Sequence, residues 1–189
     1  LPEQARTWQN EHLIYTHGYG LVMSQVAQVS PEGLPQMLVK DIPPVAAAPA
    51  LKVSQPAIYF GERANDYVVV RTDTQEFDYP KGDENVYTTY AGTGGVDVSS
   101  WLDRAAFAWR FTSLKMLVSD SITGQSRILI HRDIRERITN IATFLEYDAD
   151  PYSVLADGRL YWILDAYTTT DSYPYSQPTA AGHNYIRNP

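Results

Sequence analysis

The clearest pattern of apolar and polar positions lies in residues 152–169, where two runs rich in β-branched and aromatic residues flank Asp157-Gly158. A two-residue Asp-Gly loop favours a type I′ turn, so it predicts a β-hairpin in which Ala156 pairs with Arg159. Both faces of the second run are apolar near its middle. We therefore expect that run to be an interior strand, buried on both sides.

A second antiparallel hairpin is predicted near residues 57–72. Residues 57–60 and 67–72 are β-branched and aromatic, and the glycine and polar residues between them are typical of a hairpin loop. Residues 75–79 and 87–90 have a similar composition on either side of a polar loop. They are expected to add edge strands to the sheet.

Two main helices are predicted, near residues 100–118 and 132–146. Ser100-x-x-Asp103 is a capping-box-like start for the first helix. In the second, apolar residues recur at helical spacing and indicate a face that packs into a core, at positions 134, 138, 141 and 145. The opposite face, which includes Arg132, is interpreted as solvated. The chain is therefore expected to be an α+β domain with a mainly antiparallel sheet.

Proline is concentrated in residues 30–56, which contain half of the 12 prolines. Because proline removes a backbone donor, neither a long helix nor a central strand is expected there, and we interpret this range as an extended connector. The chain starts at Leu1 rather than Met. Residues 1–189 are therefore interpreted as a single soluble domain cut from a larger protein.

The composition narrows the classes of partner and of chemistry. Fifteen Lys and Arg against 22 Asp and Glu give a formal net charge of −7, which disfavours nucleic acid as a partner. The absence of Cys excludes disulfides, thiolate metal sites and Cys nucleophiles. No apolar run reaches the ~18 residues of a membrane span. No cofactor-binding motif is complete, so no cofactor is expected.

Carboxylates and hydroxyls are densest around the predicted 152–169 hairpin. Their oxygen atoms could bind a hard cation, with Asp148 and Asp150 as the metal candidates, although the EF-hand pattern does not continue beyond them. Asp165 stands out because a carboxylate on a buried strand needs a partner or access to solvent. The candidate ligand-binding residues are His131, Asp148, Asp150, Tyr152, Asp165 and Tyr167, and the hydroxyls of Thr168–Thr170, Tyr173 and Ser176 extend the set.

The stretch from Thr7 to Gly20 contains two histidines and a glutamate, but it matches neither zinc motif. His12 and His17 are five positions apart, whereas a zinc-binding helix places His at i and i+4 or follows the inverted His-x-x-Glu-His pattern. We interpret the stretch as a strand or turn, in which the glycines bend the backbone.

Long and unusual blocks of the chain resemble uncharacterised protein family 0182, a family of large bacterial membrane proteins. They include T-W-Q-N-E-H-L-I-Y-T-H-G-Y-G at 7–20, S-R-I-L-I-H-R-D-I-R-E-R at 126–137, F-L-E-Y-D-A-D-P-Y at 144–152 and D-G-R-L-Y-W-I-L-D-A-Y-T-T-T at 157–170. The resemblance implies a multipass protein with several N-terminal spans and a long soluble region outside the cytoplasm, to which this segment would belong. It implies no activity, cofactor or catalytic residue.

The leading hypothesis is an extracytoplasmic binding or interaction module that serves envelope assembly or ligand capture. Its expected partners are the membrane-embedded remainder of the same protein and an envelope glycan or protein. The alternative is an envelope hydrolase that uses Asp150 or Asp165 with His131 as acid and base. A third hypothesis, a purely structural role, predicts no sizeable concave site.

Overall fold

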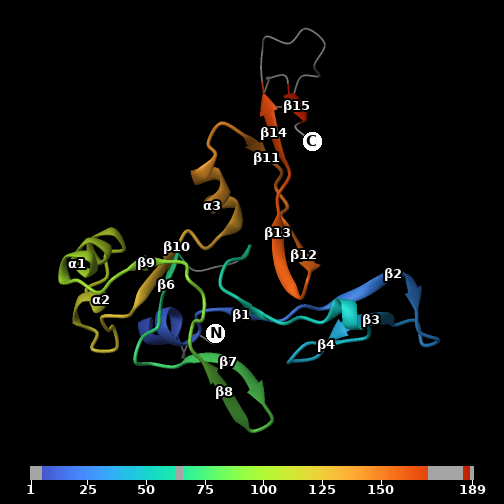
Figure 1. The fold of residues 1–189 in the computed structure, drawn as a ribbon, viewed down its shortest axis with the longest axis horizontal. Helices are drawn as coiled ribbons and strands as arrows, with labels where there is room; N and C mark the ends of the chain where they lie inside the picture. The colour runs from blue at the N-terminus through green and yellow to red at the C-terminus, as the bar shows by residue number, and fades with distance from the viewer. Residues whose placement is uncertain (1–5, 63–65, 170–184, 188–189) are drawn as a thin grey trace.

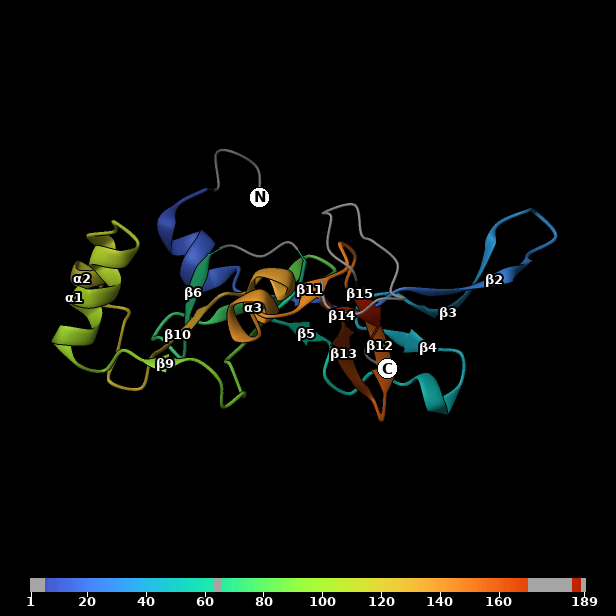
Figure 2. The ribbon, with the colours of Figure 1, turned by 90° about the horizontal axis from the view of Figure 1, so that it is seen from above.

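The computed structural model of the chain describes residues 6–62, 66–169 and 185–187. The molecule is elongated. Figures 1 and 2 show helices α1 (Trp101–Arg110) and α2 (Lys115–Val118) at one end of the long axis and strands β2 (Met23–Val29) and β3 (Pro35–Lys40) at the other. Small antiparallel sheets and short helices lie between the two ends, which confirms the predicted α+β class.

The core is built on a three-stranded antiparallel sheet in the order β6–β10–β9. Strands β6 (Tyr67–Val70) and β10 (Arg127–Ile130) pair over their whole lengths, and β9 (Val96–Asp97) pairs with the other edge of β10. Every residue of β6 is buried. A strand buried on both faces needs cover from two sides, and two apolar clusters provide it.

The two clusters lie on opposite faces of this sheet because successive side chains of a strand alternate. On one face the sheet packs against the helical turn η2 (Asn10–Ile14), α1 and α2, and the fully buried residues include Leu13, Val69, Met116 and Ile128. On the other face the cluster consists of Val68, Val70, Tyr90 and Leu129, with Tyr59 and Phe60 packed against it. The core therefore joins segments that are far apart in the sequence.

The first predicted helix forms in two pieces. Ser100 caps α1, and its Oγ accepts a hydrogen bond from the backbone N–H of Asp103, as the capping box predicts. Thr112 has a positive φ of 51° just beyond α1, and the short helix α2 follows. The continuous helix expected over residues 100–118 is thus divided, because one left-handed residue redirects the chain.

Helix α3 (Ile134–Ile141) is shorter than the predicted range 132–146. Asp133 caps it, and its carboxylate accepts a hydrogen bond from the backbone N–H of Glu136. Ile134 is buried, but Ile141 is 71% exposed. The predicted apolar face is therefore covered only near the start of the helix, because the helix ends where that face would have continued.

Residues 57–72 contain two strands, as predicted, but these strands do not pair with each other. Strand β5 (Ala57–Ile58) pairs with β1 (Gly18–Tyr19), whereas β6 pairs with β10. The apolar run of β10 offers β6 a partner four residues long, and β5 spans only two residues. The predicted pairing is therefore wrong. Strands β7 (Glu76–Lys81) and β8 (Glu84–Thr88) lie on either side of the polar loop as expected, but they pair with each other in a separate two-stranded sheet and add no edge to the β6–β10–β9 sheet.

The proline-rich range 30–56 contains a small sheet. Strand β3 lies between β2 and β4 (Val45–Ala46), and Pro49–Leu51 form a single 3₁₀ turn. The expectation that no central strand forms in this range is wrong, because Pro35 occupies the first residue of β3, where its missing donor is tolerated. Figures 1 and 2 show this sheet extending from the rest of the molecule, and we call it the β2–β4 arm.

The hairpin on Asp157-Gly158 is confirmed. Strands β12 (Tyr152–Ala156) and β13 (Arg159–Ile163) pair in the predicted register, and both turn residues have the positive φ of a type I′ turn, 49° and 75°. The hairpin is a separate two-stranded sheet, and Tyr161 is 48% exposed. The predicted burial of β13 on both sides is wrong, because no third strand within the described residues pairs with its outer edge.

Candidate functional site

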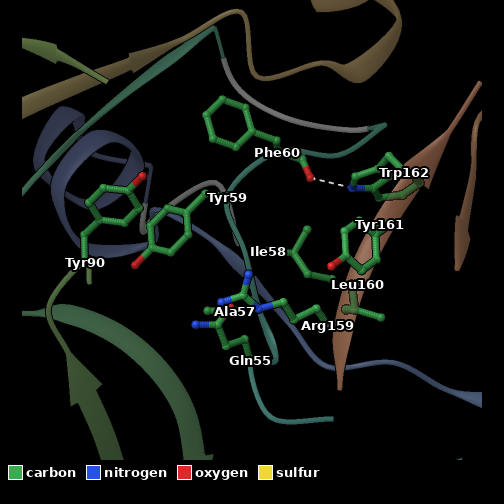
Figure 3. A pocket seen from close by; sticks show the side chains of 10 residues that line it. All are labelled: Gln55, Ala57, Ile58, Tyr59, Phe60, Tyr90, Arg159, Leu160, Tyr161 and Trp162. Carbon is green, nitrogen blue, oxygen red and sulfur yellow. Dashed lines mark hydrogen bonds between the residues drawn. The ribbon is translucent and has the colours of Figure 1, made fainter. Parts of the chain in front are cut away.

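A pocket of about 340 Å³ lies between β13 and the chain around β5. Figure 3 shows that the two walls face each other, with Ile58 and Tyr59 on one side and Tyr161 and Trp162 on the other. We call it the aromatic pocket, and its principal side chains are Tyr59, Phe60, Tyr90, Arg159, Tyr161 and Trp162. Apolar pockets with few polar groups are the usual form of small-ligand sites, and the purely structural hypothesis does not predict one.

Hydrogen bonds close the aromatic pocket at both ends. At the hairpin turn, the backbone N–H of Ser54 donates to the carbonyl oxygen of Gly158 at 2.8 Å, and the Ser54 hydroxyl donates to the same oxygen. At the other end, the indole Nε1–H of Trp162 donates to the carbonyl oxygen of Phe60 at 2.8 Å. The hairpin is thus held against residues 54–60 at two points, and the pocket lies between them.

A buried carboxylate lies behind the aromatic pocket. Glu76 is 1% exposed and accepts hydrogen bonds from the hydroxyls of Thr16 and Tyr59 and from the backbone N–H of Tyr90. These donors offset the cost of removing a carboxylate from water. Because Tyr59 and Tyr90 also line the pocket, Glu76 fixes one lining residue by its phenol hydroxyl and the other by its backbone.

A histidine and an arginine surround this carboxylate. The ring of His17 stacks on Tyr59 with 4.6 Å between centroids, and its Nε2 lies 3.1 Å from Asp78 Oδ1. Arg132 is 5% exposed, and its guanidinium donates to the backbone carbonyls of Tyr59 and Thr16. We call these side chains the buried network, which consists of Thr16, His17, Tyr59, Glu76, Asp78 and Arg132.

Burial and hydrogen bonding shift the pKa values of Glu76, Tyr59 and Arg132. Burial raises the pKa of Glu76, but hydrogen bonds from His17, Thr16, Tyr59 and Tyr90 together outweigh burial, so the pKa lies below its usual value. Burial, together with the Glu76 carboxylate, raises the pKa of Tyr59 far above its usual range, so this phenol stays protonated. Burial lowers the pKa of Arg132 to about 10, which leaves it charged at neutral pH.

These charge states favour a supporting role for the buried network. Glu76 is ionised and accepts several hydrogen bonds, and the Tyr59 hydroxyl is engaged by Glu76 rather than free to bind a ligand. Neither group is free to exchange a proton with a substrate. The pocket therefore offers a ligand its aromatic side chains and the guanidinium of Arg159.

The structure brings several of the predicted site residues together in a different place. The hydroxyl of Tyr167, on β14 (Ala166–Thr169), donates to Asp148 Oδ2 at 3.2 Å, and the backbone N–H of Asp148 donates to the carbonyl oxygen of Asp165. Strand β14 pairs with β11 (Glu146–Tyr147) and β15 (Tyr185–Arg187). These contacts connect β11 to β14, so Asp148 and Tyr167 help to hold strand ends together.

Asp165 is partly exposed, and its carboxylate forms no hydrogen bond or ion pair with another described residue. Access to solvent, one of the two expected solutions for this carboxylate, therefore fits its surroundings. Asp150 and Tyr152 are exposed beside the start of β12. The predicted hydroxyl donors Thr170, Tyr173 and Ser176 lie outside the described residues.

His131, the expected acid or base, lies in another pocket, also of about 340 Å³. Its Nδ1 is 2.6 Å from Glu136 Oε1, and its Nε2 is 3.4 Å from a nitrogen of Arg110. Because a guanidinium only donates, Nε2 accepts and Nδ1 donates to Glu136. Neither Asp150 nor Asp165 is among the described residues that line this pocket.

A polar groove of about 690 Å³ adjoins the His131 pocket, and both contain Asp66, Arg110 and Phe111. Within the groove, the Nδ1–H of His12 donates to the carbonyl oxygen of Tyr67 at 2.9 Å, and burial lowers the pKa of His12. His12 is therefore held as a neutral ring against the edge of β6. Across the described part of the chain, no three His, Cys, Asp or Glu side chains form a group that could hold a metal ion.

The local sequence pattern does not predict the buried network. Glu76 and Asp78 alternate with Phe77 and Tyr79, and such a pattern on an edge strand usually directs the acidic side chains to solvent. The structure directs Glu76 inward, where it meets Thr16 and Tyr59, which are 60 and 17 positions away. No local pattern contains these partners, and Arg132 was assigned to a solvated helix face.

Large apolar side chains are exposed at both ends of the molecule. On the helical end, which we call the α1–α2 face, the exposed residues are Trp101, Leu102, Trp109, Leu114 and Val118. On and beside the β2–β4 arm they are Val22, Val26, Val29, Leu34, Ile42 and Val45.

The chain is similar to known proteins over its whole length. The uncharacterised protein family UPF0182 matches residues 1–189. A UPF0182 protein of Pelotomaculum thermopropionicum is 52% identical over 188 residues, one of Sulfurovum sp. is 50% identical over 194 residues, and one of Cupriavidus necator is 51% identical over 189 residues. Each match covers 100% of this chain but only 20% to 21% of the relative.

The similarity is therefore to a segment of much longer proteins, since the chain spans about a fifth of the length of these relatives. No solved structure matches the chain. Among the helices that the structure describes, none combines the length and the apolar character that a membrane span requires.

Proposed function

Because the chain belongs to the uncharacterised protein family UPF0182, we propose that it is an extracytoplasmic interaction module of a multipass membrane protein. In this proposal the α1–α2 face and the β2–β4 arm dock onto the remainder of the same polypeptide. The observation that carries the proposal is the uncovered apolar surface at both ends of the molecule. Extended apolar patches on a folded chain are typical of interaction surfaces.

The kind of side chain exposed fits this role. The exposed residues on the α1–α2 face and on the β2–β4 arm include tryptophan, leucine, isoleucine and valine. Burial of such apolar surface against a partner would stabilise the assembly by about 25 cal/mol per Å².

The remainder of the same polypeptide is the partner that fits best. The relatives extend well beyond the matched segment, because it covers only 20% to 21% of their length. A covalently attached partner is present at a high effective concentration, so even modest apolar contacts would stay formed. The net charge of −7 disfavours an anionic lipid surface as the alternative partner.

The absence of cysteine allows a direct test in the full-length protein. Trp109→Cys on the α1–α2 face and Val26→Cys on the arm are introduced separately, after any cysteine elsewhere in the full-length protein has been replaced. Intact cells are then treated with a membrane-impermeant maleimide. We expect both cysteines to be labelled slowly, whereas Asp83→Cys, at an exposed polar position in the β7–β8 turn, is labelled rapidly.

The experiment tests the extracytoplasmic location and the docking of the two apolar faces separately. Labelling of Asp83→Cys only after the cells are permeabilised would show that the segment does not lie outside the cytoplasm. Labelling of Trp109→Cys and Val26→Cys at the rate of Asp83→Cys would show that neither apolar face is covered.

A further inference from the structure

We propose that the aromatic pocket binds an acidic sugar, a pyranose ring that carries a carboxylate, as in a hexuronic acid. The inference goes beyond the proposed docking role, because the pocket lies between β13 and residues 54–60 and not on either exposed apolar face. It rests on the shape of the pocket, on its aromatic lining and on the position of one arginine.

The shape of the pocket favours a compact ligand over an extended peptide. The outer edge of β13 has no strand partner among the described residues, so a peptide strand could in principle add there. The Ser54–Gly158 and Trp162–Phe60 hydrogen bonds, both 2.8 Å long, close the two ends of the gap. A continuous strand therefore cannot lie along the gap, whereas a single ring fits a pocket of about 340 Å³.

The aromatic lining of the pocket provides the kind of surface on which a sugar ring packs. The indole N–H of Trp162 is engaged by Phe60, and the hydroxyl of Tyr59 is engaged by Glu76. Both rings are thus held in position by contacts at their polar ends. An aromatic face is the negative part of the ring's quadrupole, and it attracts the weakly positive C–H groups on one side of a pyranose ring.

Arg159 supplies the preference for an acid. It is the only charged side chain among the described residues that line the pocket, and it forms no hydrogen bond or salt bridge with any of the residues described. Figure 3 shows its side chain reaching from β13 toward Gln55. A guanidinium binds a carboxylate through two parallel N–H donors, and the Gln55 amide can both donate to and accept from ring hydroxyls.

The test uses the full-length protein in detergent and saturation-transfer NMR, with methyl glucuronide as the acidic probe and methyl glucoside as its neutral counterpart. We expect saturable binding of methyl glucuronide and weaker binding of methyl glucoside. Arg159→Gln should weaken methyl glucuronide binding by about tenfold or more, because a charged hydrogen-bond partner is lost. It should leave methyl glucoside binding unchanged.

Matched variants separate the pocket from its surroundings. Tyr161→Ala removes a ring of the pocket that is 48% exposed, and Tyr152→Ala removes an equally exposed ring of the same hairpin that does not line the pocket. Only Tyr161→Ala should weaken both probes. Arg135→Gln, on the exposed side of α3, is the control for Arg159→Gln and should change neither.

Three results would overturn the proposal. The first is no saturable binding of methyl glucuronide by the unmodified protein. The second is binding that Arg159→Gln and Tyr161→Ala leave unchanged, and the third is displacement of methyl glucuronide by acetate at equal concentration, which would mean that the ring is not recognised. A glucuronic acid oligosaccharide identifies the source: tighter binding than the methyl glycoside supports a glycan chain, and equal binding supports a free sugar acid.

The outcome is independent of the docking proposal. Cysteine protection at Trp109 and Val26 reports on the two exposed apolar faces, and neither residue lines the aromatic pocket. If the protein binds no acidic sugar but the cysteines at positions 109 and 26 are labelled slowly, the sugar-binding proposal is contradicted and the docking proposal is not.

Discussion

Strands β6 and β2 both contain valine, yet their surroundings are opposite. Val68, Val69 and Val70 of β6 are completely buried, whereas Val26 of β2 is fully exposed. Both strands have residues of high β propensity. The difference is in what covers them: η2, α1 and Tyr90 pack on the faces of β6, and β2 has only β3 as a strand partner on the arm. Propensity thus selects the strand, and segments distant in the sequence decide its burial.

The largest predicted effect contrasts a residue from each environment. Leu129 is completely buried on β10, directly opposite Val68. Leu129→Ala removes packing from the covered strand and should lower the free energy of unfolding by about 2 to 5 kcal/mol. Val26→Ala on the arm should change it by no more than about 0.5 kcal/mol. Urea unfolding of the chain, followed by tryptophan fluorescence, measures both changes.

Equal decreases in the free energy of unfolding for Leu129→Ala and Val26→Ala would contradict the comparison, because they would mean that the arm is packed as tightly as the core. A small loss for both would instead mean that the β6–β10 pair contributes little to stability. The control is Leu129→Met, which keeps the side-chain volume and should cost less than about 1.5 kcal/mol.

The same contrast explains which features the sequence could predict. The Asp157-Gly158 turn and the Ser100 cap depend on residues within a few positions of each other, and both have the predicted geometry. The pairing of β6 depends on β10, some sixty positions later, and the local pattern favoured β5 instead. For turns, caps and strand pairing, the predictions that hold depend on residues close together in the sequence, and the wrong pairing depends on a distant strand. The helix lengths were also overestimated, because a left-handed residue at Thr112 and the early end of α3 are not part of the apolar pattern.

The candidate site follows this rule as well. Arg159 and Trp162 lie on a strand that was predicted correctly, but the opposite wall of the aromatic pocket comes from residues about 100 positions earlier. The carboxylates around Asp148 and Asp165 can be recognised as candidates because they are close together in the sequence. Glu76 cannot, because its surroundings form only when Thr16, Tyr59 and β7 meet.

The second prediction concerns Glu76, the carboxylate of the buried network, which is 1% exposed. Glu76→Gln weakens the acceptor for Thr16 and Tyr59, and should lower the free energy of unfolding by about 1 to 3 kcal/mol at pH 7. Because the folded-state pKa of Glu76 lies below its usual value, the carboxylate stabilises the fold above the unfolded-state pKa. This stabilisation is lost as the pH falls through the folded-state pKa.

Urea unfolding of both proteins at a series of pH values from 7 downward provides the measurement. The difference between wild type and Glu76→Gln should narrow as the solution becomes acidic, because a protonated carboxyl group resembles an amide. Glu84→Gln, at an exposed position on β8, should follow the wild-type curve throughout. A difference that stays constant with pH would show that the charge of Glu76 does not contribute.

The smallest effect is expected at the cap of α1, the helix that helps to cover β6. The hydroxyl of Ser100 accepts from the backbone N–H of Asp103, so Ser100→Ala should lower the free energy of unfolding by about 1 kcal/mol. Ser100→Asn keeps an acceptor and should restore most of that loss. Hydrogen exchange sharpens the test: amides in the first turn of α1 should exchange faster in Ser100→Ala, while those of Val68 and Val70 change little. Equal losses for the Ala and Asn variants would mean that the serine stabilises α1 by something other than its cap.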